Sequence, residues 1–335
     1  RRCCGDRRRR LVKRARLAAE AAVPALDPLP AVVPGRMVRL DGSGTYVRAV
    51  PPRGDGAEPA LYLHGLGGSS VNWTDLAELL ADRLDGEAID LPGFGRSDPA
   101  PSYTLPAMAR RAVRWIEARG CGPVHLLGNS MGGAVSVYLA ATRPDLVRTL
   151  TLISPAMPFL DPRRSVQARF VPLLLLPRAG RLIGRRMAAI DPVELATMVI
   201  ETCYADPALF PDQRLVEAAA EARLRSALPW YGDAYVGSLR GLVGSFLRAY
   251  LPGGGSLWRL ARRVTAPTLV IAGMRDRLVD VRVAPQVARL IPDCRLLLLD
   301  GVGHVAQMEA PRSVARAFLG LLDEVTPAAG QGMAG

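Results

Sequence analysis

The feature that most constrains the fold is a G-x-S-x-G pattern, with Ser130 at its centre and Gly128 and Gly132 on either side. The apolar run 124–127 precedes it, and the small, mostly apolar residues 133–141 follow it. A buried strand, a tight turn and a buried helix are therefore predicted in this order. At such a turn the serine hydroxyl projects from the sheet, where the free N–H groups at the helix start favour negative charge. The two glycines let the neighbouring strand and helix approach the turn closely.

Short apolar segments alternate with helix-like segments in two parts of the chain, residues 36–155 and 265–326. This alternation predicts an α/β fold with a mostly parallel, twisted sheet and helices on both faces. We expect strands at 37–40, 46–50, 60–63, 87–90, 124–127, 147–153, 268–272 and 295–299, and helices at 73–84, 105–119, 131–142, 283–290 and 305–322.

The alternation stops between the two parts. Residues 156–264 contain no strand-like pattern, are helix-like, are interrupted by many prolines and are rich in large apolar side chains. We interpret this segment as a helical cap inserted into the α/β core. The small residues at 327–335 predict a disordered tail.

Residues 1–35 are predicted to form a basic arm followed by a proline-rich linker. Residues 1–17 contain nine Lys and Arg residues against one Asp, a net charge of +8 out of +12 for the chain. The folded body is therefore only mildly basic, and no nucleic-acid binding by it is expected. The pattern at 11–20 indicates a short helix. Residues 1–23 could make weak contact with an anionic membrane, and the alternative is a disordered tail without this role.

No apolar run reaches the roughly 18 residues that a membrane span requires, and the N-terminal residues lack the pattern of a secretory signal. The five cysteines have no spacing typical of a zinc site. We therefore expect reduced thiols, neither metal nor cofactor, and a cytoplasmic protein that could be peripheral at the membrane.

A serine hydroxyl needs a base to become a nucleophile, and the chain offers three histidines. His304 follows the strand at 295–299, at the sheet edge where the carboxyl ends of strands gather, so it is the predicted base. His125 lies inside a predicted buried strand and is interpreted as a core residue. His64 precedes a glycine-rich loop and is interpreted as a residue that orients this loop.

The base needs a carboxylate that fixes its tautomer. Asp276 lies in the first turn after the strand at 268–272 and is preferred, while Asp280 and Asp300 are the alternatives.

An oxyanion intermediate needs preorganised N–H donors. The backbone N–H of Met131, directly after the serine, is the first predicted donor. The second is the N–H of Leu66, in the loop where Gly65 allows the backbone to turn close to the site.

Five segments together resemble the α/β-hydrolase superfamily over residues 36–325: 64–68, 90–98, 128–133, 273–276 and 303–304. The resemblance implies a catalytic triad of Ser130, His304 and Asp276. A serine at this turn differs from the aspartate of haloalkane dehalogenases and epoxide hydrolases. The Gly-Asn-Ser-Met-Gly-Gly form is also similar to serine C–C hydrolases, which usually carry Trp after the histidine, where this chain has Val305.

The sequence therefore predicts a serine hydrolase of a lipophilic carboxylic ester, such as an acylglycerol or a thioester. The apolar composition of the cap segment is the reason for expecting a lipophilic substrate. Two alternatives stay open. One is hydrolysis of a C–C bond in a ring-fission-type diketone, and the other is a non-catalytic binding protein with this fold.

Overall fold

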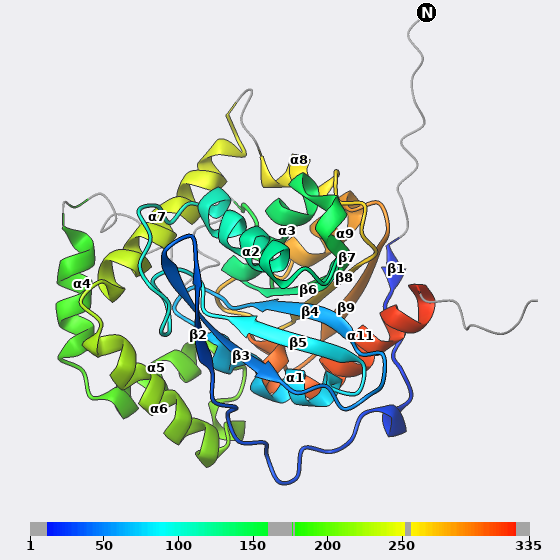
Figure 1. The fold of residues 1–335 in the computed structure, drawn as a ribbon, viewed down its shortest axis with the longest axis horizontal. Coiled ribbons are helices and arrows are strands. Elements are labelled where there is room, and N and C mark those ends of the chain that lie inside the picture. The colour runs from blue at the N-terminus through cyan, green and yellow to red at the C-terminus, as the bar shows by residue number, and fades with distance from the viewer. Residues whose placement is uncertain (1–11, 160–175, 177, 252–255, 326–335) are drawn as a thin grey trace, which may run out of the picture.

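The computed structural model describes residues 12–159, 176, 178–251 and 256–325. A nine-stranded sheet of described residues forms its centre, in the order β1-β9-β8-β7-β6-β4-β5-β3-β2 (Figure 1). The pairs β2·β3 and β3·β5 are antiparallel, and all other pairs are parallel. The strands are β1 (Lys13–Arg14), β2 (Arg36–Leu40), β3 (Ser43–Val50), β4 (Glu58–Leu63), β5 (Leu84–Ile89), β6 (Val124–Asn129), β7 (Val147–Ile153), β8 (Thr268–Gly273) and β9 (Cys294–Leu299).

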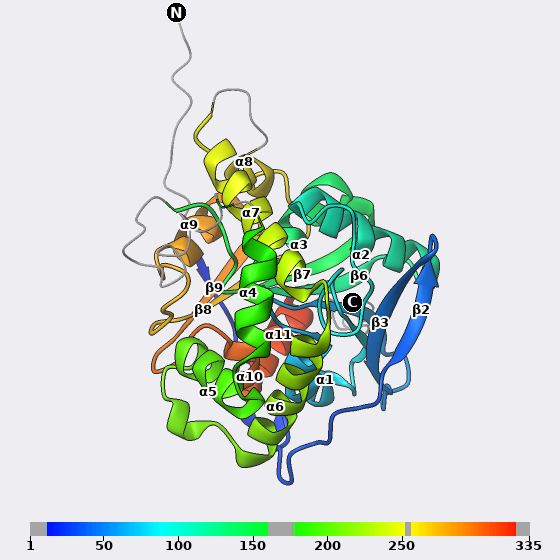
Figure 2. The same cartoon turned by 90° about the vertical axis from the view of Figure 1, so that its left-hand side faces the viewer.

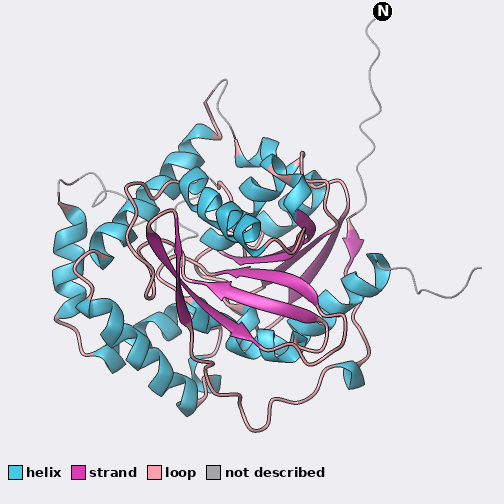
Figure 3. Cartoon of the chain, viewed as in Figure 1, coloured by secondary structure: helices cyan, strands magenta, loops and turns pink. Residues whose placement is uncertain are grey.

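Helices cover both faces of this sheet (Figure 3). One face carries α2 (Leu105–Arg119), α3 (Met131–Thr142), α8 (Leu257–Ala261) and α9 (Val283–Leu290). The other carries α1 (Thr74–Leu80), α10 (Ala306–Glu309) and α11 (Pro311–Val325). Each layer buries its own apolar cluster against the sheet. The predicted parallel sheet with helices on both faces is thus confirmed.

The central strand β6 is buried along its whole length, and its two polar residues, His125 and Asn129, both have hydrogen-bond partners. Its neighbours are in register at their carboxyl ends, with Leu63 beside Gly128 and Asn129 beside Ile153. The loops that follow β4, β6 and β7 therefore start side by side at one edge of the sheet.

Of the described helices between β7 and β8, four lie in front of this carboxyl edge (Figure 2). They are α4 (Ala179–Ala188), α5 (Pro192–Cys203), α6 (Asp212–Ala227) and α7 (Tyr231–Arg248). Among the described residues of 156–264 there is no strand, as the sequence predicts. The following helix, α8, buries Leu257 and Leu260 in the core beside α3, so this last part of the segment belongs to the layer over the sheet.

The prediction of a short helix at 11–20 is wrong. Lys13 and Arg14 instead form β1, which pairs with the edge of β9, and the N–H of Ala15 donates to the carbonyl of Leu296 at 3.0 Å. Val23 is 1% exposed, packed with α1 and α11. An open strand edge offers a full row of backbone partners, whereas a short isolated helix is only marginally stable in water.

Two predicted helices are shorter than expected. The one expected at 73–84 ends at Leu80, because β5 already begins at Leu84. The one expected at 305–322 is divided into α10 and α11 at Pro311, whose ring cannot continue a helix.

The basic residues 1–11 and the tail at 327–335 lie outside the described residues. None of the helices in the described part combines the length and the apolar composition that crossing a bilayer requires.

Candidate active site

Ser130 occupies a strained turn between β6 and α3. Its φ of 54° and ψ of −117° lie in a region that residues other than glycine rarely adopt. The backbone around it is held firmly: its N–H donates to the carbonyl of Ile153 at 3.0 Å, and its carbonyl accepts from Ala156 at 2.9 Å. Because Ser130 is only partly buried, its side chain stands at an accessible apex.

The two glycines of the motif have no room for a side chain. A β-carbon on Gly132 would overlap the carbonyl oxygens of Leu63 and His64, and one on Gly128 would overlap the hydroxyl of Ser136. The turn therefore depends on glycine at both positions for steric reasons, as the sequence predicts.

His304 and Asp276 are joined by a hydrogen bond from Nδ1 to Oδ2 of 2.8 Å. Their side chains are 5% and 2% exposed, respectively. The other carboxylate oxygen of Asp276 accepts the N–H groups of Leu278 at 2.8 Å and Val279 at 3.0 Å. Burial raises the pKa of Asp276, but the imidazole and these two N–H groups together lower it below its ordinary value. The site thus holds an ionised carboxylate against Nδ1, which leaves Nε2 as the ring atom that can accept a proton.

The two alternative carboxylates are engaged elsewhere. Asp280 accepts the backbone N–H of Arg282 at 3.0 Å and pairs with its guanidinium. Asp300 is exposed and accepts the N–H of Gly301 at 2.9 Å.

Asn129 connects the serine turn to the histidine loop. Its Nδ2 donates to the carbonyl of His304 at 3.2 Å and to that of Ile153 at 3.1 Å. Among the described residues no hydrogen bond joins the Ser130 hydroxyl to the imidazole. Such bonds are often long in ligand-free enzymes and shorten when substrate binds. The sequence analysis gives Asn129 no role, although an amide side chain directly before the predicted nucleophile was a usable signal.

The loop after β4 lies directly against the serine: a β-carbon on Gly65 would be 3.1 Å from the β-carbon of Ser130. The imidazole of His64 fixes this loop, because Nε2 accepts the N–H of Leu91 at 2.9 Å and Nδ1 donates to the carbonyl of Gly65 at 2.7 Å. In a trans peptide the next N–H, that of Leu66, points away from this carbonyl. His64 therefore sets the direction of the Leu66 N–H.

His64 is neutral in this arrangement. It is completely buried, and burial lowers its pKa although the carboxylate of Asp90 acts in the opposite direction. The other predicted donor belongs to Met131, the first residue of α3, whose N–H has no acceptor within its own helix.

His125 takes no part in the site. Its Nδ1 contacts the hydroxyl of Thr149 at 2.8 Å and its Nε2 contacts Glu58 at 3.3 Å, while its ring packs edge-on against Phe318. These contacts agree with its interpretation as a core histidine.

Helices α6 and α7 cover the outer side of the Gly65–Gly68 loop. The Tyr231 hydroxyl and the Tyr235 ring would each be 3.3 Å from a β-carbon on Gly67. Arg225 donates to the carbonyl of Gly67, and Leu66 packs in the same apolar cluster as Tyr235. The site is therefore walled by aromatic and apolar side chains and one guanidinium.

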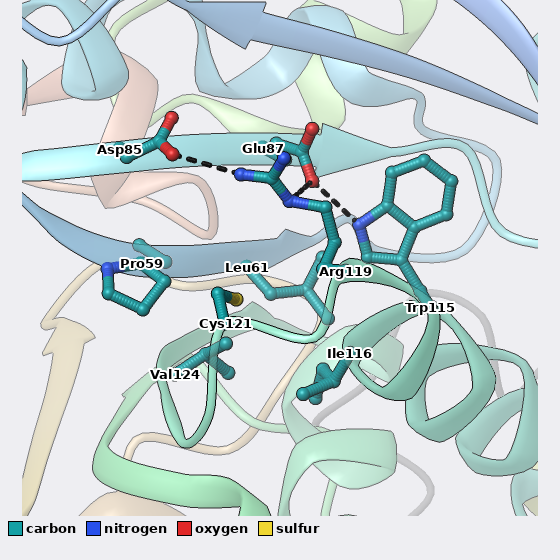
Figure 4. A pocket seen from close by; sticks show the side chains of 10 residues that line it. Pro59, Leu61, Asp85, Glu87, Trp115, Ile116, Arg119, Cys121 and Val124 are labelled. Atoms are coloured by element: carbon teal, nitrogen blue, oxygen red, sulfur yellow. Dashed lines mark hydrogen bonds and ion pairs between the residues drawn. The ribbon is translucent and has the colours of Figure 1, made fainter.

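A small hollow lies away from this edge, between β5 and α2 (Figure 4). Glu87 accepts the indole N–H of Trp115 at 2.9 Å and pairs with Arg119 at 3.0 Å, and Arg119 also pairs with Asp85. Both carboxylates therefore have a guanidinium partner, and Arg36 from outside the hollow also pairs with Glu87 at 3.1 Å. In the described ranges no group of three or more His, Cys, Asp or Glu residues could hold a metal ion.

The model of the alpha/beta hydrolase fold family matches residues 59–311. The chain is 30% identical over 258 residues to the dihydrolipoyllysine-residue acetyltransferase component of the acetoin cleaving system of Cupriavidus necator. That match covers 77% of this chain but only 61% of the relative's length. It is 28% identical to monoacylglycerol lipase abhd6-B of Xenopus laevis, covering 87% of this chain and 83% of that protein.

Among solved structures, the fold is similar to that of a bacterial membrane phospholipase A, with a TM-score of 0.70 and 23% identity. The similarity covers 88% of this chain and 86% of the phospholipase chain.

Proposed function

Because the chain belongs to the alpha/beta hydrolase fold family, we propose that it cleaves lipophilic carboxylic esters through Ser130, His304 and Asp276. The observation that carries the proposal is the buried 2.8 Å hydrogen bond between His304 and Asp276 at the sheet edge where the strained Ser130 turn lies. A buried carboxylate that fixes an imidazole tautomer beside a serine turn is the arrangement that nucleophilic acyl transfer requires.

In the proposed reaction the Ser130 hydroxyl oxygen attacks the acyl carbon while Nε2 of His304 accepts its proton. His304 then protonates the leaving alkoxide, and an acyl-enzyme remains on Ser130. A water molecule attacks this ester, gives its proton to His304, and the acid leaves as the proton returns to Ser130. Asp276 stays ionised throughout and stabilises the imidazolium.

The N–H groups of Leu66 and Met131 would bind the oxyanion of each tetrahedral intermediate. The contact of His64 with the Gly65 carbonyl orients the Leu66 N–H, and the start of α3 presents the Met131 N–H. Donors of this kind are effective because they are already oriented before the charge develops, and losing one costs about 10²–10³ in rate.

Two observations support a lipophilic acyl or alcohol group. The wall over the Gly65–Gly68 loop contains Leu66, Tyr231 and Tyr235, and helices α4–α7 would act as a cap that shields a substrate from water. The relatives include proteins named monoacylglycerol lipase and lipase, and one named as an acetyltransferase component. Acylglycerols and thioesters are therefore the substrates to test first.

The proposal is tested with p-nitrophenyl esters of increasing acyl length, using purified wild type and Ser130→Ala. We expect turnover to rise with acyl length beyond acetate and to be lost in Ser130→Ala. Equal turnover by Ser130→Ala would remove the proposed mechanism. A clear preference for a vinylogous diketone over every ester would instead favour the C–C hydrolase alternative, and failure to react with any fluorophosphonate would favour the non-catalytic one.

We also propose that the basic segment 1–23 makes weak contact with an anionic membrane. Sedimentation with vesicles of anionic or zwitterionic lipid tests this: deletion of residues 1–11, which leaves β1 intact, should weaken binding to anionic vesicles only. Unchanged binding after the deletion would refute the contact.

A further inference from the structure

The end of helix α5 lies against the loop that presents His304. The N–H of His304 donates to the carbonyl of Cys203 at 2.7 Å. A β-carbon on Gly303 would overlap this carbonyl and would lie 2.7 Å from the backbone nitrogen of Ala205. The contact is therefore made backbone to backbone, and only glycine at position 303 permits it.

The carboxylate of Glu309 bridges the same two segments. Its Oε2 accepts the N–H of Gly303 at 2.7 Å, and its Oε1 accepts the N–H of Ala205 at 3.0 Å. Glu309 is the last residue of α10, five residues after His304, and is only partly exposed. Hydrogen bonds to an ionised acceptor are stronger than those between neutral groups, so this bridge is a firm link between α5 and the histidine loop.

The same helix end also binds the loop that carries Asp276. Arg277, the next residue, donates from Nη1 to the carbonyl of Glu201 at 2.9 Å. The last carbonyls of a helix lack N–H donors within the helix and are free to accept hydrogen bonds from such side chains. The C-terminal turn of α5 is thus bound to both loops that form the His304–Asp276 pair.

We infer that Glu309 is a positioning residue of the proposed hydrolase: it fastens α5 to the histidine loop and so fixes where the imidazole stands relative to Ser130. The inference rests on the proposed function. On the carbonyl side, the His304 backbone is held by Asn129. On the N–H side it is held by Cys203, two residues before the Ala205 N–H that Glu309 binds. A displacement of about 1 Å in such a constellation can reduce the rate about 10²-fold.

The test is Glu309→Gln, whose amide oxygen can accept only one of the two N–H groups while its NH₂ opposes the other. We expect kcat per titrated active site to fall at least tenfold, with KM within about twofold of wild type, because the groups that contact substrate are unchanged. Glu324→Gln is the matched control. It breaks a 2.7 Å pair with Arg295 at the start of β9, away from the site, and should keep the wild-type kcat.

Two measurements, kcat per titrated active site and backbone amide exchange at His304, separate a positioning role from an effect on stability alone. Backbone amide exchange at His304, followed by NMR, should be faster in Glu309→Gln than in Glu324→Gln, because its partner segment is released. An unchanged kcat per titrated site with unchanged amide exchange, even with a lower Tm, would overturn the inference. If wild type neither turns over esters nor reacts with a fluorophosphonate, the proposed function fails, whereas faster His304 exchange in Glu309→Gln would still support the bridge.

Discussion

Asp276→Asn is the substitution whose consequence follows most directly from the hydrogen bonds of the site. One carboxylate oxygen of Asp276 accepts two N–H groups, from Leu278 and Val279, and the other faces Nδ1 of His304. An asparagine has one acceptor oxygen, and directing it to the two backbone N–H groups satisfies both. Its NH₂ then faces Nδ1, which must become an acceptor, so the ring proton moves to Nε2. This is the wrong tautomer for accepting the proton of Ser130.

The expected loss follows from the role of the tautomer. In serine hydrolases, the Asp-to-Asn change leaves the geometry intact and lowers kcat by about 10⁴. That factor corresponds to about 5 kcal/mol of transition-state stabilisation. Because neither oxygen of Asp276 faces the substrate in the proposed mechanism, KM should change little.

The assay is steady-state hydrolysis of a p-nitrophenyl ester, with active sites titrated by a fluorophosphonate. Asp280→Asn is the matched control, because Asp280 contacts Arg282 rather than the imidazole, and it should retain kcat within about threefold. Retention of more than a tenth of wild-type kcat by Asp276→Asn, or a larger loss in Asp280→Asn, would refute this reasoning.

Three further predictions concern the loop support His64, the two buried histidines outside the proposed triad, and two glycines. His64→Ala should lower kcat about 10²-fold with little change in KM, because the Leu66 N–H loses the contact that directs it; steady-state kinetics would detect this, and a wild-type kcat would contradict it. Burial lowers the pKa of both His64 and His125, so the unfolded chain binds protons that the folded chain does not. The free energy of unfolding should therefore fall as the pH drops below about 6.5, and urea titrations between pH 5 and 8 that show no fall would exclude this. Gly132→Ala places a methyl group onto the Leu63 carbonyl and should prevent stable folding. In contrast, Gly244→Ala has no heavy atom within 4 Å of the new methyl group. It should raise the free energy of unfolding by up to about 1 kcal/mol, because alanine favours the helix more than glycine does. Equal melting temperatures for the two variants would contradict this expectation.

Much of the fold was predictable because its central strands are largely buried on both faces. The strand β8 is buried at every position and begins at Thr268, as the sequence pattern predicts. The pattern also predicts the observed bounds of β7 and of helix α9. The error at 11–20 has a different origin. Lys13 pairs with Arg295, and no local pattern can reveal a partner at the far end of the chain.

The predicted site residues share one recognisable property: each directly follows a parallel strand or the turn after it. The carboxyl ends of such strands meet at one edge, which is why Ser130, Asp276 and His304 could be selected without coordinates. The hydrogen bonds that hold these three residues in place could not be predicted from the sequence. Asn129 and Glu309 act through side chains that reach segments distant in sequence, at His304 and Ala205 respectively, and their geometry depends on the packed structure.

The central claim is that Ser130 is a nucleophile activated by His304 and Asp276. The most direct test is mass spectrometric mapping of fluorophosphonate-labelled protein, with Ser130→Ala and His304→Ala labelled in parallel. We expect one adduct, on Ser130, in the wild type, none in Ser130→Ala, and labelling at least 10²-fold slower in His304→Ala. An adduct on any other residue, or labelling of Ser130 at the same rate without His304, would contradict it.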